Sequence, residues 1–311
     1  MIHTLRGLDI LSAGQFTKEH VDAILSRAKE MQEIVEKKGY TDILHGKIMT
    51  ALFYEPSSRT FGSFVASMQR LGGGFIPLQG VTYSSVSKGE TVEDTVRTFA
   101  AYSDVLVIRY PHVGGATIAA DMLDIPVINA GDGNGEHPTQ ALLDLFTIST
   151  HVPAIGGSTI TLVGDLLNGR TVHSLVSLLA LYKPAVVHCI APNELQMPEE
   201  YIAILKKAGI TVSNSESLDD VLATTDVLYV TRVQKERFRD LDVYERLKHK
   251  YIISKETMKH IKPSSILMHP FPRVGEILPE VDSDPRAVYL REQIKNGMYI
   301  RMALLSLVLD K

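Results

Sequence analysis

Residues 48–78 have the sequence IMTALFYEPSSRTFGSFVASMQRLGGGFIPL, and this segment carries the clearest sign of the fold. It begins with a short apolar run, Ile48–Tyr54, which is typical of a buried β-strand. Apolar residues then recur at three- and four-residue spacing, which indicates a helix, and the glycines at 72–74 end it. A second apolar run follows at Gly74–Leu78. The segment therefore predicts a strand–helix–strand unit with parallel strands.

Strand and helix signals alternate in the same way along almost the whole chain of 311 residues. Further strands are predicted at Val105–Tyr110, Val127–Ala130, Thr159–Val163, Ala185–Ile190, Val227–Thr231 and Ile266–His269. The stretch HVPAIGGS at 151–158 interrupts the alternation, because Pro and Gly mark loops. We therefore expect an α/β fold with two doubly wound domains, residues 1–150 and 151–284, each with a central parallel sheet flanked by helices. Residues 284–310 have the pattern of a long terminal helix, interrupted around Asn296-Gly297.

The composition excludes several classes of protein. Apolar residues make up 45% and charged residues 22% of the chain, and the net charge of −4 gives no general attraction to nucleic acid or to an anionic membrane. The single cysteine, Cys189, cannot form an intramolecular disulfide or a thiolate metal cage. The opening residues do not resemble a secretory signal, and no apolar run approaches the ~20 residues that span a bilayer. We expect a cytoplasmic protein that acts on small molecules.

Ligands bind at the carboxyl ends of the strands in an open parallel sheet, so the residues that follow each strand are the first candidates for a site. After the first strand, Ser57, Ser58, Arg59 and Thr60 combine three hydroxyl groups, a guanidinium and the free N–H groups of a helix start. This combination suits a phosphate or a similar dianion. The alternative is that the hydroxyl groups only cap the helix and that Arg59 is solvated.

Two further strand ends in the first half carry polar side chains. Arg109 lies at the end of the strand 105–110, and His137 and Gln140 lie one turn apart where a helix follows a glycine-rich loop. Each feature alone has a structural alternative, because arginines often end strands and histidines often cap helices. Lys88 belongs to the polar segment SSVSKGE at 84–90, which by itself is typical of a solvated surface loop.

The second half offers a second anion site. Arg170 opens a helix after the strand 159–163, and the absence of Gly-x-Gly-x-x-Gly there disfavours a dinucleotide cofactor. Arg232 and Arg237 follow another strand. Glu55 would repel a phosphate bound beside it, so we expect it to pair with Arg170 or Arg237 when the domains close over their ligands. The alternative is that Glu55 only complements a helix N-terminus.

Taken together, six motifs resemble the aspartate carbamoyltransferase family, in order and over nearly the whole chain. They are SSRT at 57–60, VIRYP at 107–111, GEHPTQ at 135–140, GRTVHSL at 169–175, TRVQKERF at 231–238 and HPFPRV at 269–274. The resemblance implies a carbamoyl phosphate domain followed by an aspartate domain, with a C-terminal helix at 285–311 that returns to the first. It also implies a homotrimer whose chains share active sites, and neither a cofactor nor a metal.

The resemblance further implies a role for each motif residue. Carbamoyl phosphate would be bound by Ser57, Ser58, Arg59, Thr60, Arg109, His137 and Gln140, and by Ser84 and Lys88 from the adjacent subunit. Aspartate would be bound by Arg170, Arg232, Gln234 and Phe271. The family commonly has Leu or Met at the position of Phe271. The residue at this position acts through its backbone in the family. The reaction would form N-carbamoyl-L-aspartate, the committed step of de novo pyrimidine (UMP) synthesis.

Three alternatives remain open at this point. Ornithine carbamoyltransferases share the phosphate-side motifs, but the arginines of the second half oppose a substrate with an ammonium side chain. That family also tends to have Cys where this chain has Pro270. A catalytically silent scaffold would not need all the phosphate-binding candidates, and a dehydrogenase is a more distant third. Association with regulatory chains or with other enzymes of the pathway is compatible with the sequence.

Overall fold

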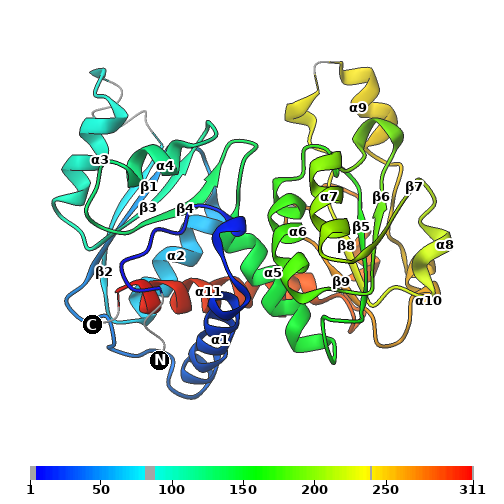
Figure 1. Cartoon of the computed structure of the whole chain (residues 1–311), viewed down its shortest axis with the longest axis horizontal. Helices are drawn as coiled ribbons and strands as arrows, with labels where there is room; N and C mark the ends of the chain where they lie inside the picture. The colour runs from blue at the N-terminus through cyan, green and yellow to red at the C-terminus, as the bar shows by residue number, and fades with distance from the viewer. Residues whose placement is uncertain (1–4, 81–87, 239, 310–311) are drawn as a thin grey trace. The chain divides into compact units, whose positions relative to one another are not determined.

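The computed structural model describes residues 5–80, 88–238 and 240–309 (Figure 1). The chain divides into two compact units, one formed by Met1–Leu143 with Lys295–Lys311 and the other by Asp144–Ile294. Both divisions fall inside helices, namely α5 (Pro138–His151) and α11 (Glu292–Leu309). The sequence predicts a domain boundary after residue 150, at the end of α5. The two compact units instead divide between Leu143 and Asp144, within that helix.

The first unit contains a parallel four-stranded sheet. Its strands, in spatial order, are β2 (Gly74–Gln79), β1 (Ile48–Phe53), β3 (Val105–Tyr110) and β4 (Val127–Asp132). Its helices are α1 (Lys18–Lys38), α2 (Ser58–Arg70), α3 (Val92–Ala100) and α4 (Gly115–Ala120), with parts of α5 and α11. The two central strands are almost completely buried, as their continuous apolar runs predict.

The second unit contains a parallel five-stranded sheet. Its strands, in spatial order, are β7 (Thr211–Ser215), β6 (Val186–Ile190), β5 (Thr159–Val163), β8 (Val227–Val230) and β9 (Ile266–Met268). Its helices include α6 (Arg170–Tyr182), α7 (Glu199–Lys207), α8 (Asp219–Leu222), α9 (Leu241–Leu247) and α10 (Lys255–His260). Two parallel sheets flanked by helices confirm the predicted doubly wound α/β fold.

The C-terminal helix begins later than expected. Residues 285–291 contain only a short 3-10 helix, Val288–Leu290, and the prediction of a helix from residue 285 is wrong. The N–H of Leu267 in β9 donates to the carbonyl of Arg286, and the carboxylate of Asp284 accepts from the N–H of Arg286. The N–H of Ala287 also donates to the carbonyl of Asp284, so residues 284–287 form a turn, and Ala287 forms an isolated β-bridge with Leu267 in place of the first turn of a helix.

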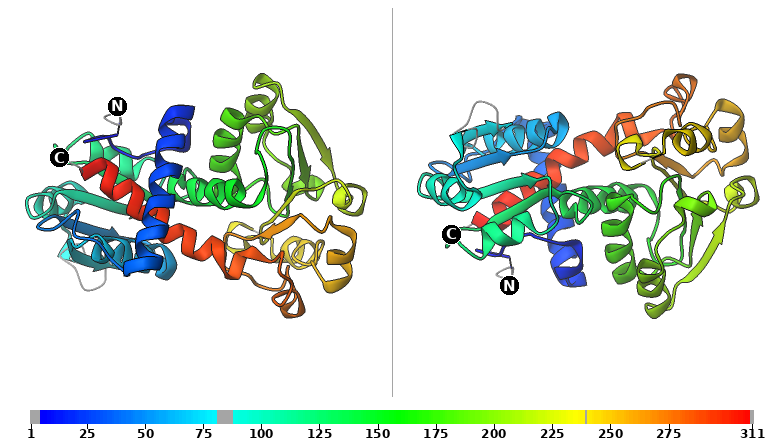
Figure 2. Two further views of the ribbon diagram at one scale, coloured as in Figure 1. Left: turned by 90° about the horizontal axis from the view of Figure 1, so that it is seen from below. Right: turned by 90° about the horizontal axis from the view of Figure 1, so that it is seen from above.

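From Lys295 onward, α11 belongs to the first unit, as the family resemblance implies (Figure 2). Ser67 of α2 donates to the carbonyl of Met298, and Arg301 of α11 donates to the hydroxyl groups of Ser63 and Thr139. The expected interruption at Gly297 is absent, and α11 is continuous there. A Cβ atom at Gly297 would lie 2.8 Å from Nη1 of Arg301, so the glycine permits a close approach.

Candidate active site

The carboxyl ends of β1, β3 and β4 lie side by side in the first sheet. Phe53 at the end of β1 pairs with Arg109 in β3, and Tyr110 pairs with Asp132 at the end of β4. Because the three strands are parallel and adjacent, the segments that follow them meet at one edge of the sheet. These segments hold most of the residues that the sequence predicts for the phosphate.

The first of these segments leads directly into α2. Ser57 occupies the N-cap position, but its side chain makes no capping hydrogen bond to the helix. The hydroxyl group of Thr60 is part of a buried side chain, whereas Ser58 and Arg59 are exposed. Since the first N–H groups of a helix have no partner within it, this turn offers hydroxyl and N–H donors to an anion.

Arg109 is a buried cation with one carboxylate partner. Its side chain is only 10% exposed, its Nη2 lies 2.8 Å from Oε2 of Glu55, and its Nη1 donates to the carbonyl of Ala130 at 3.2 Å. Burial lowers the pKa of Arg109, and the neighbouring carboxylate of Glu55 opposes this effect. The Nε of Arg109 has no hydrogen-bond partner in the described part of the chain. This guanidinium can therefore donate a further hydrogen bond to a bound phosphate.

The loop between β4 and α5 brings His137 and Gln140 to the same edge. The carboxylate of Asp132 accepts from the N–H groups of Glu136, at 2.7 Å, and Gly114, at 2.9 Å. A Cβ atom at Gly133 would lie 2.6 Å from the carbonyl oxygen of Pro111, so this position requires glycine. His137 is buried immediately before the first residue of α5, and Gln140 lies on the first turn, partly exposed.

Ser84 and Lys88 are the residues that the family resemblance assigns to the neighbouring chain's site. Lys88 is exposed, next to Gly89 and ahead of α3. Ser84 lies outside the described residues.

In the second unit, the ends of β5 and β8 are joined by hydrogen bonds to Gln234. Its backbone N–H donates to Asp165 at 3.3 Å, and its side-chain amide donates to the carbonyl of Asn168 at 2.8 Å. Burial raises the pKa of Asp165, and the hydrogen bonds from Asn168 and Gln234 partly offset this rise. Asp165 was not among the predicted residues, although its place after a buried strand and before Arg170 is a usable signal.

The cations of the second unit have different environments. Arg170 is the first residue of α6 and is partly buried. Arg232 is partly buried and forms two hydrogen bonds to the carboxylate of Glu236. Burial alone would lower the pKa of Arg232, but the carboxylate of Glu236, together with Glu276 and Tyr244, outweighs burial and raises that pKa. Arg237 is exposed at the end of a short 3-10 helix, Lys235–Arg237.

Phe271 follows β9, which lies next to β8 in the sheet. Its φ angle of 55° is in the left-handed region, which is unusual for a bulky residue, and the Phe271-Pro272 peptide bond is cis. The N–H of Phe271 donates to Nδ1 of His269 at 2.8 Å. His269 is itself buried and forms a 2.6 Å contact between its Nε2 and Oε1 of Glu276. The backbone of this turn is therefore held by internal hydrogen bonds.

The structure thus places the predicted residues at two sheet edges. The edge of the first sheet has Glu55, Ser57, Ser58, Arg59, Thr60, Arg109, His137 and Gln140. The edge of the second sheet has Arg170, Arg232, Gln234, Arg237 and Phe271. Both edges are rich in donors and cations, which suits anionic ligands.

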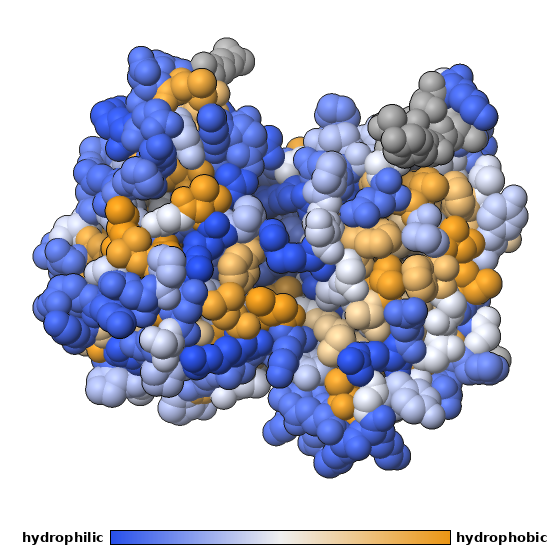
Figure 3. Space-filling view, turned by 180° about the vertical axis from the view of Figure 1, so that it is seen from behind, coloured by the Kyte–Doolittle hydropathy of each residue, from blue (hydrophilic) through white to orange (hydrophobic). Residues whose placement is uncertain are grey.

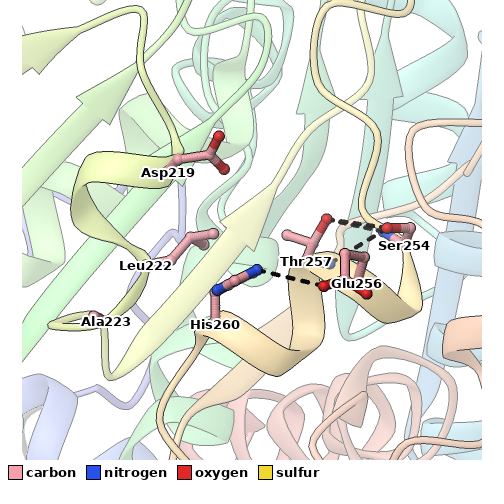
Figure 4. Close-up of a pocket in the computed structure, with 7 residues that line it drawn as sticks. All are labelled: Asp219, Leu222, Ala223, Ser254, Glu256, Thr257 and His260. Atoms are coloured by element: carbon pink, nitrogen blue, oxygen red, sulfur yellow. Dashed lines mark hydrogen bonds and ion pairs between the residues drawn. The ribbon is translucent and has the colours of Figure 1, made fainter.

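A surface pocket of about 500 Å³ lies elsewhere in the second unit, between α8 and α10 (Figure 4). Its lining consists of Asp219, Leu222, Ala223, Ser254, Glu256, Thr257 and His260, and includes none of the predicted site residues. Nε2 of His260 lies 3.7 Å from Oε1 of Glu256, and Ser254 caps α10. The polar groups that α10 and its cap contribute to this pocket thus pair with each other or stabilise that helix, and Asp219 lies in the first turn of α8.

Other types of site have little support among the described residues. No group of three or more His, Cys, Asp or Glu side chains in the described ranges could hold a metal ion. Burial raises the pKa of the Cys189 thiol to about 12, so this thiol is not a nucleophile at neutral pH. Within the same ranges, no helix combines the length and the apolar character that a membrane span requires.

Comparisons with known proteins agree with this division into two edges. The family description "Aspartate/ornithine carbamoyltransferase, carbamoyl-P binding domain" matches residues 8–150, and "Asp/Orn binding domain" matches residues 156–308. The chain is 46% identical to the aspartate carbamoyltransferase catalytic subunit of Methanopyrus kandleri, over 97% of each chain. It is 49% identical over 98% of its length to the multifunctional protein pyr1-3 of Dictyostelium discoideum, of which it spans 14%. The crystal structure of Trypanosoma cruzi aspartate transcarbamoylase in complex with carbamoyl phosphate and aspartate has a TM-score of 0.94 and 43% identity, and covers 99% of this chain and 98% of that one.

Proposed function

Because the chain belongs to the aspartate/ornithine carbamoyltransferase family, we propose that it transfers the carbamoyl group of carbamoyl phosphate to the α-amine of L-aspartate. The products are N-carbamoyl-L-aspartate and phosphate, and the reaction is the committed step of de novo pyrimidine synthesis. The observation that carries this proposal is the pair of cationic sheet edges, one for each anionic substrate. It is supported by a relative of nearly equal length that is named for the same activity.

Carbamoyl phosphate binds at the edge of the first sheet in this proposal. The phosphate contacts Ser57, Ser58, Arg59, Thr60 and Arg109, together with Ser84 and Lys88 of a neighbouring chain, and the carbamoyl group contacts His137 and Gln140. The ion pair of Arg109 with Glu55 supports this assignment, because an incoming phosphate is a stronger partner for a buried guanidinium than a partly exposed carboxylate.

The amine of aspartate then attacks the carbamoyl carbon and forms a tetrahedral adduct. Arg59, Thr60 and His137 stabilise the negative charge that develops on the carbonyl oxygen, and loss of one such donor costs about 3–4 kcal/mol. Collapse of the adduct breaks the bond to phosphate, whose charge is stabilised by Arg109, Lys88 and Ser57. The departing phosphate takes the proton of the amine. Neither a covalent intermediate, a metal nor a cofactor is needed.

Aspartate binds at the edge of the second sheet. Arg170, Arg232 and Gln234 contact its carboxylates, and the backbone of Phe271 contributes to the same site. The alternative substrate, ornithine, has a cationic side chain, which these arginines repel. A silent scaffold is the other alternative, and the retained phosphate-binding set opposes it.

Closure of the two domains aligns the amine with the carbonyl carbon in this proposal. Phosphate binding to Arg109 releases the carboxylate of Glu55, which then pairs with Arg170 or Arg237. The observation that supports this step is that Glu55 has Arg109 as its partner and is about one-third exposed, so it is available for exchange.

The active unit is a homotrimer in which neighbouring chains complete each other's sites. An exposed Lys88 supports this proposal, as do the apolar side chains that gather on the first unit in Figure 3. The multifunctional relatives support association with other enzymes of the pathway. A single, unpaired and buried cysteine supports a reducing, cytoplasmic location.

The test is an assay of carbamoyl product and phosphate release with aspartate and ornithine in parallel. We expect turnover with aspartate and little or none with ornithine. Turnover with ornithine alone would assign the chain to the other branch of its family. Absence of turnover with both amines, in a folded protein that binds carbamoyl phosphate, would favour the silent scaffold.

A further inference from the structure

A chain of buried hydrogen bonds leads to the turn that carries Phe271. The hydroxyl of Tyr229 in β8 donates to Oδ2 of Asp144 in α5 at 2.7 Å. The side-chain amide of Gln293 in α11 donates to Oδ1 of the same carboxylate at 2.7 Å, and its Oε1 accepts from the backbone N–H of His269 at 3.0 Å. None of these four side chains is more than 3% exposed, so water does not replace these hydrogen bonds.

The two partners of Gln293 fix the orientation of its amide group. A carboxylate only accepts hydrogen bonds, so the NH₂ of Gln293 must face Asp144. A backbone N–H only donates, so the oxygen of the same amide must face His269. The carboxylate of Asp144 therefore determines which atom of Gln293 is presented to the backbone of the turn.

From His269 the hydrogen bonds continue through the turn itself. Nδ1 of the His269 ring accepts from the N–H of Phe271 at 2.8 Å, so the ring proton lies on Nε2 and is donated to Glu276 at 2.6 Å. The second oxygen of Glu276 accepts from the N–H of Val274 at 2.9 Å. A bulky residue in the left-handed region is strained, and these hydrogen bonds hold Phe271 there.

We infer that Asp144 and Gln293 are positioning residues for the second substrate, because they hold the backbone of His269 and, through it, the Phe271 turn in its binding conformation. The inference rests on the proposed function in one respect, the contact between this turn and aspartate. Neither residue touches a substrate in this proposal. Their effect is expected in the affinity for aspartate and not in the affinity for carbamoyl phosphate.

The inference can be tested by exchanging the amide of Gln293 and the carboxylate of Asp144. Gln293→Met removes both hydrogen bonds with a side chain of similar size, and Gln293→Glu places a second carboxylate against Asp144. Combining Gln293→Glu with Asp144→Asn restores the three bonds described above, because the new amide donates to the new carboxylate and accepts from Tyr229, and the new carboxylate accepts from the N–H of His269. Tyr229→Phe is the matched control, since it removes a bond to Asp144 but leaves the orientation of Gln293 unchanged.

The measurements are the KM of aspartate, the Kd of carbamoyl phosphate, and hydrogen exchange of the peptide 266–276 in the full chain. Both single changes at Gln293 should raise the KM of aspartate about tenfold or more and speed this exchange. Gln293→Met leaves the buried N–H of His269 without an acceptor, and Gln293→Glu sets two buried carboxylates against each other. The Kd of carbamoyl phosphate should stay within about twofold. The combined variant should recover most of the loss, because it again pairs a donor with an acceptor at this contact. Tyr229→Phe should lower stability and leave the KM of aspartate near that of the parent chain.

An unchanged KM in a folded Gln293→Met variant would overturn the inference, and so would a combined variant that fails to fold or to recover. If Gln293→Met does not fold, the comparison of Gln293→Glu with the combined variant decides. If the parent chain does not use aspartate at all, the proposed function fails. Hydrogen exchange then tests the positioning role by itself: exchange of 266–276 that is equal in all variants would overturn that role.

Discussion

Arg109 shows at the scale of one residue how burial and charge prepare a binding site. Its guanidinium is removed from water but paired with only one carboxylate, that of Glu55, which is itself partly exposed. The Nε of this guanidinium has no hydrogen-bond partner among the described residues, and a buried donor of this kind is costly until an acceptor joins it. We infer that the cost is recovered when phosphate binds, and that Glu55 then becomes available to the second domain.

Glu55→Gln tests this exchange of partners. If Glu55 helps to hold the closed state, the change should lower kcat and raise the KM of aspartate by about tenfold or more, the size of a charge-assisted hydrogen bond. Carbamoyl phosphate should still bind. In solution scattering, a bisubstrate mimic that links a phosphonate to aspartate should compact the parent chain more than the variant. Unaltered kinetics together with equal compaction would show that Glu55 only complements a helix end.

Arg232 provides the matching prediction for the second substrate. Arg232→Ala should lower kcat/KM for aspartate on the order of ten- to a hundredfold, because a charge-assisted contact to a carboxylate contributes about 1.5–3 kcal/mol. The Kd of carbamoyl phosphate should change little. Glu236→Gln removes the charge of the carboxylate that pairs with Arg232 but keeps the arginine, so it should lower kcat/KM for aspartate less than Arg232→Ala does. A variant that lost carbamoyl phosphate and kept aspartate would show that the two sheet edges are assigned the wrong way round.

At the scale of the element, the sequence predicts the strands that contain an apolar run and misses the one edge strand that lacks such a run, β7. β3 and β5 begin and end as predicted, because a continuous apolar run has no other stable place than a sheet interior. β7 was not predicted, since none of its residues is buried and its sequence, Thr211–Ser215, lacks an apolar run. Helix α1 was not predicted either, although Thr17 caps it and Gly39 ends it in the left-handed conformation.

Among the candidate site residues, positions at strand ends could be found from the sequence, but their interaction partners could not. Candidates at strand ends, such as Arg109, could be singled out because the ends of parallel strands meet at one edge, whereas Gln234 was a candidate only through the family resemblance. Their partners could not, since the pairing of Arg109 with Glu55 and of Gln234 with Asp165 depends on which loops fold against each other. The link from Asp144 to His269 joins residues far apart in sequence and has no sequence signature.

Two helical glycines should respond in opposite ways to alanine. Gly62 in α2 has no atom within 4 Å of a Cβ position, so Gly62→Ala should raise the free energy of unfolding by about 0.5–1 kcal/mol. Gly297 in α11 has Nη1 of Arg301 at 2.8 Å and Leu143 at 3.2 Å from that position. Since Arg301 is buried and held by Ser63, Gly297→Ala should give no gain or a loss. Urea unfolding measures both, and equal stabilisation would contradict the packing described for α11.

At the scale of the whole molecule, the proposed trimer makes catalysis a property of neighbouring chains. Arg59→Ala and Lys88→Ala chains should each be nearly inactive, but mixed and re-equilibrated chains should recover part of the turnover. A hybrid contains sites that combine the intact Arg59 of one chain with the intact Lys88 of its neighbour. Mixing Arg59→Ala with Thr60→Ala is the control, because both changes affect the same chain's contribution and no intact site forms. Equal recovery in the two mixtures, or none in either, would exclude shared sites of this kind.

The central claim, that this chain joins the carbamoyl carbon to the amine of aspartate, can be measured directly by isotope labelling. Carbamoyl phosphate labelled with ¹³C is incubated with ¹⁵N-aspartate and the purified chain, and the products are observed by NMR. We predict a one-bond ¹³C–¹⁵N coupling that appears together with an equal amount of phosphate, and that is lost in Arg59→Ala. Phosphate release without this coupling, while the label accumulates in spontaneous breakdown products or on added ornithine, would contradict the claim.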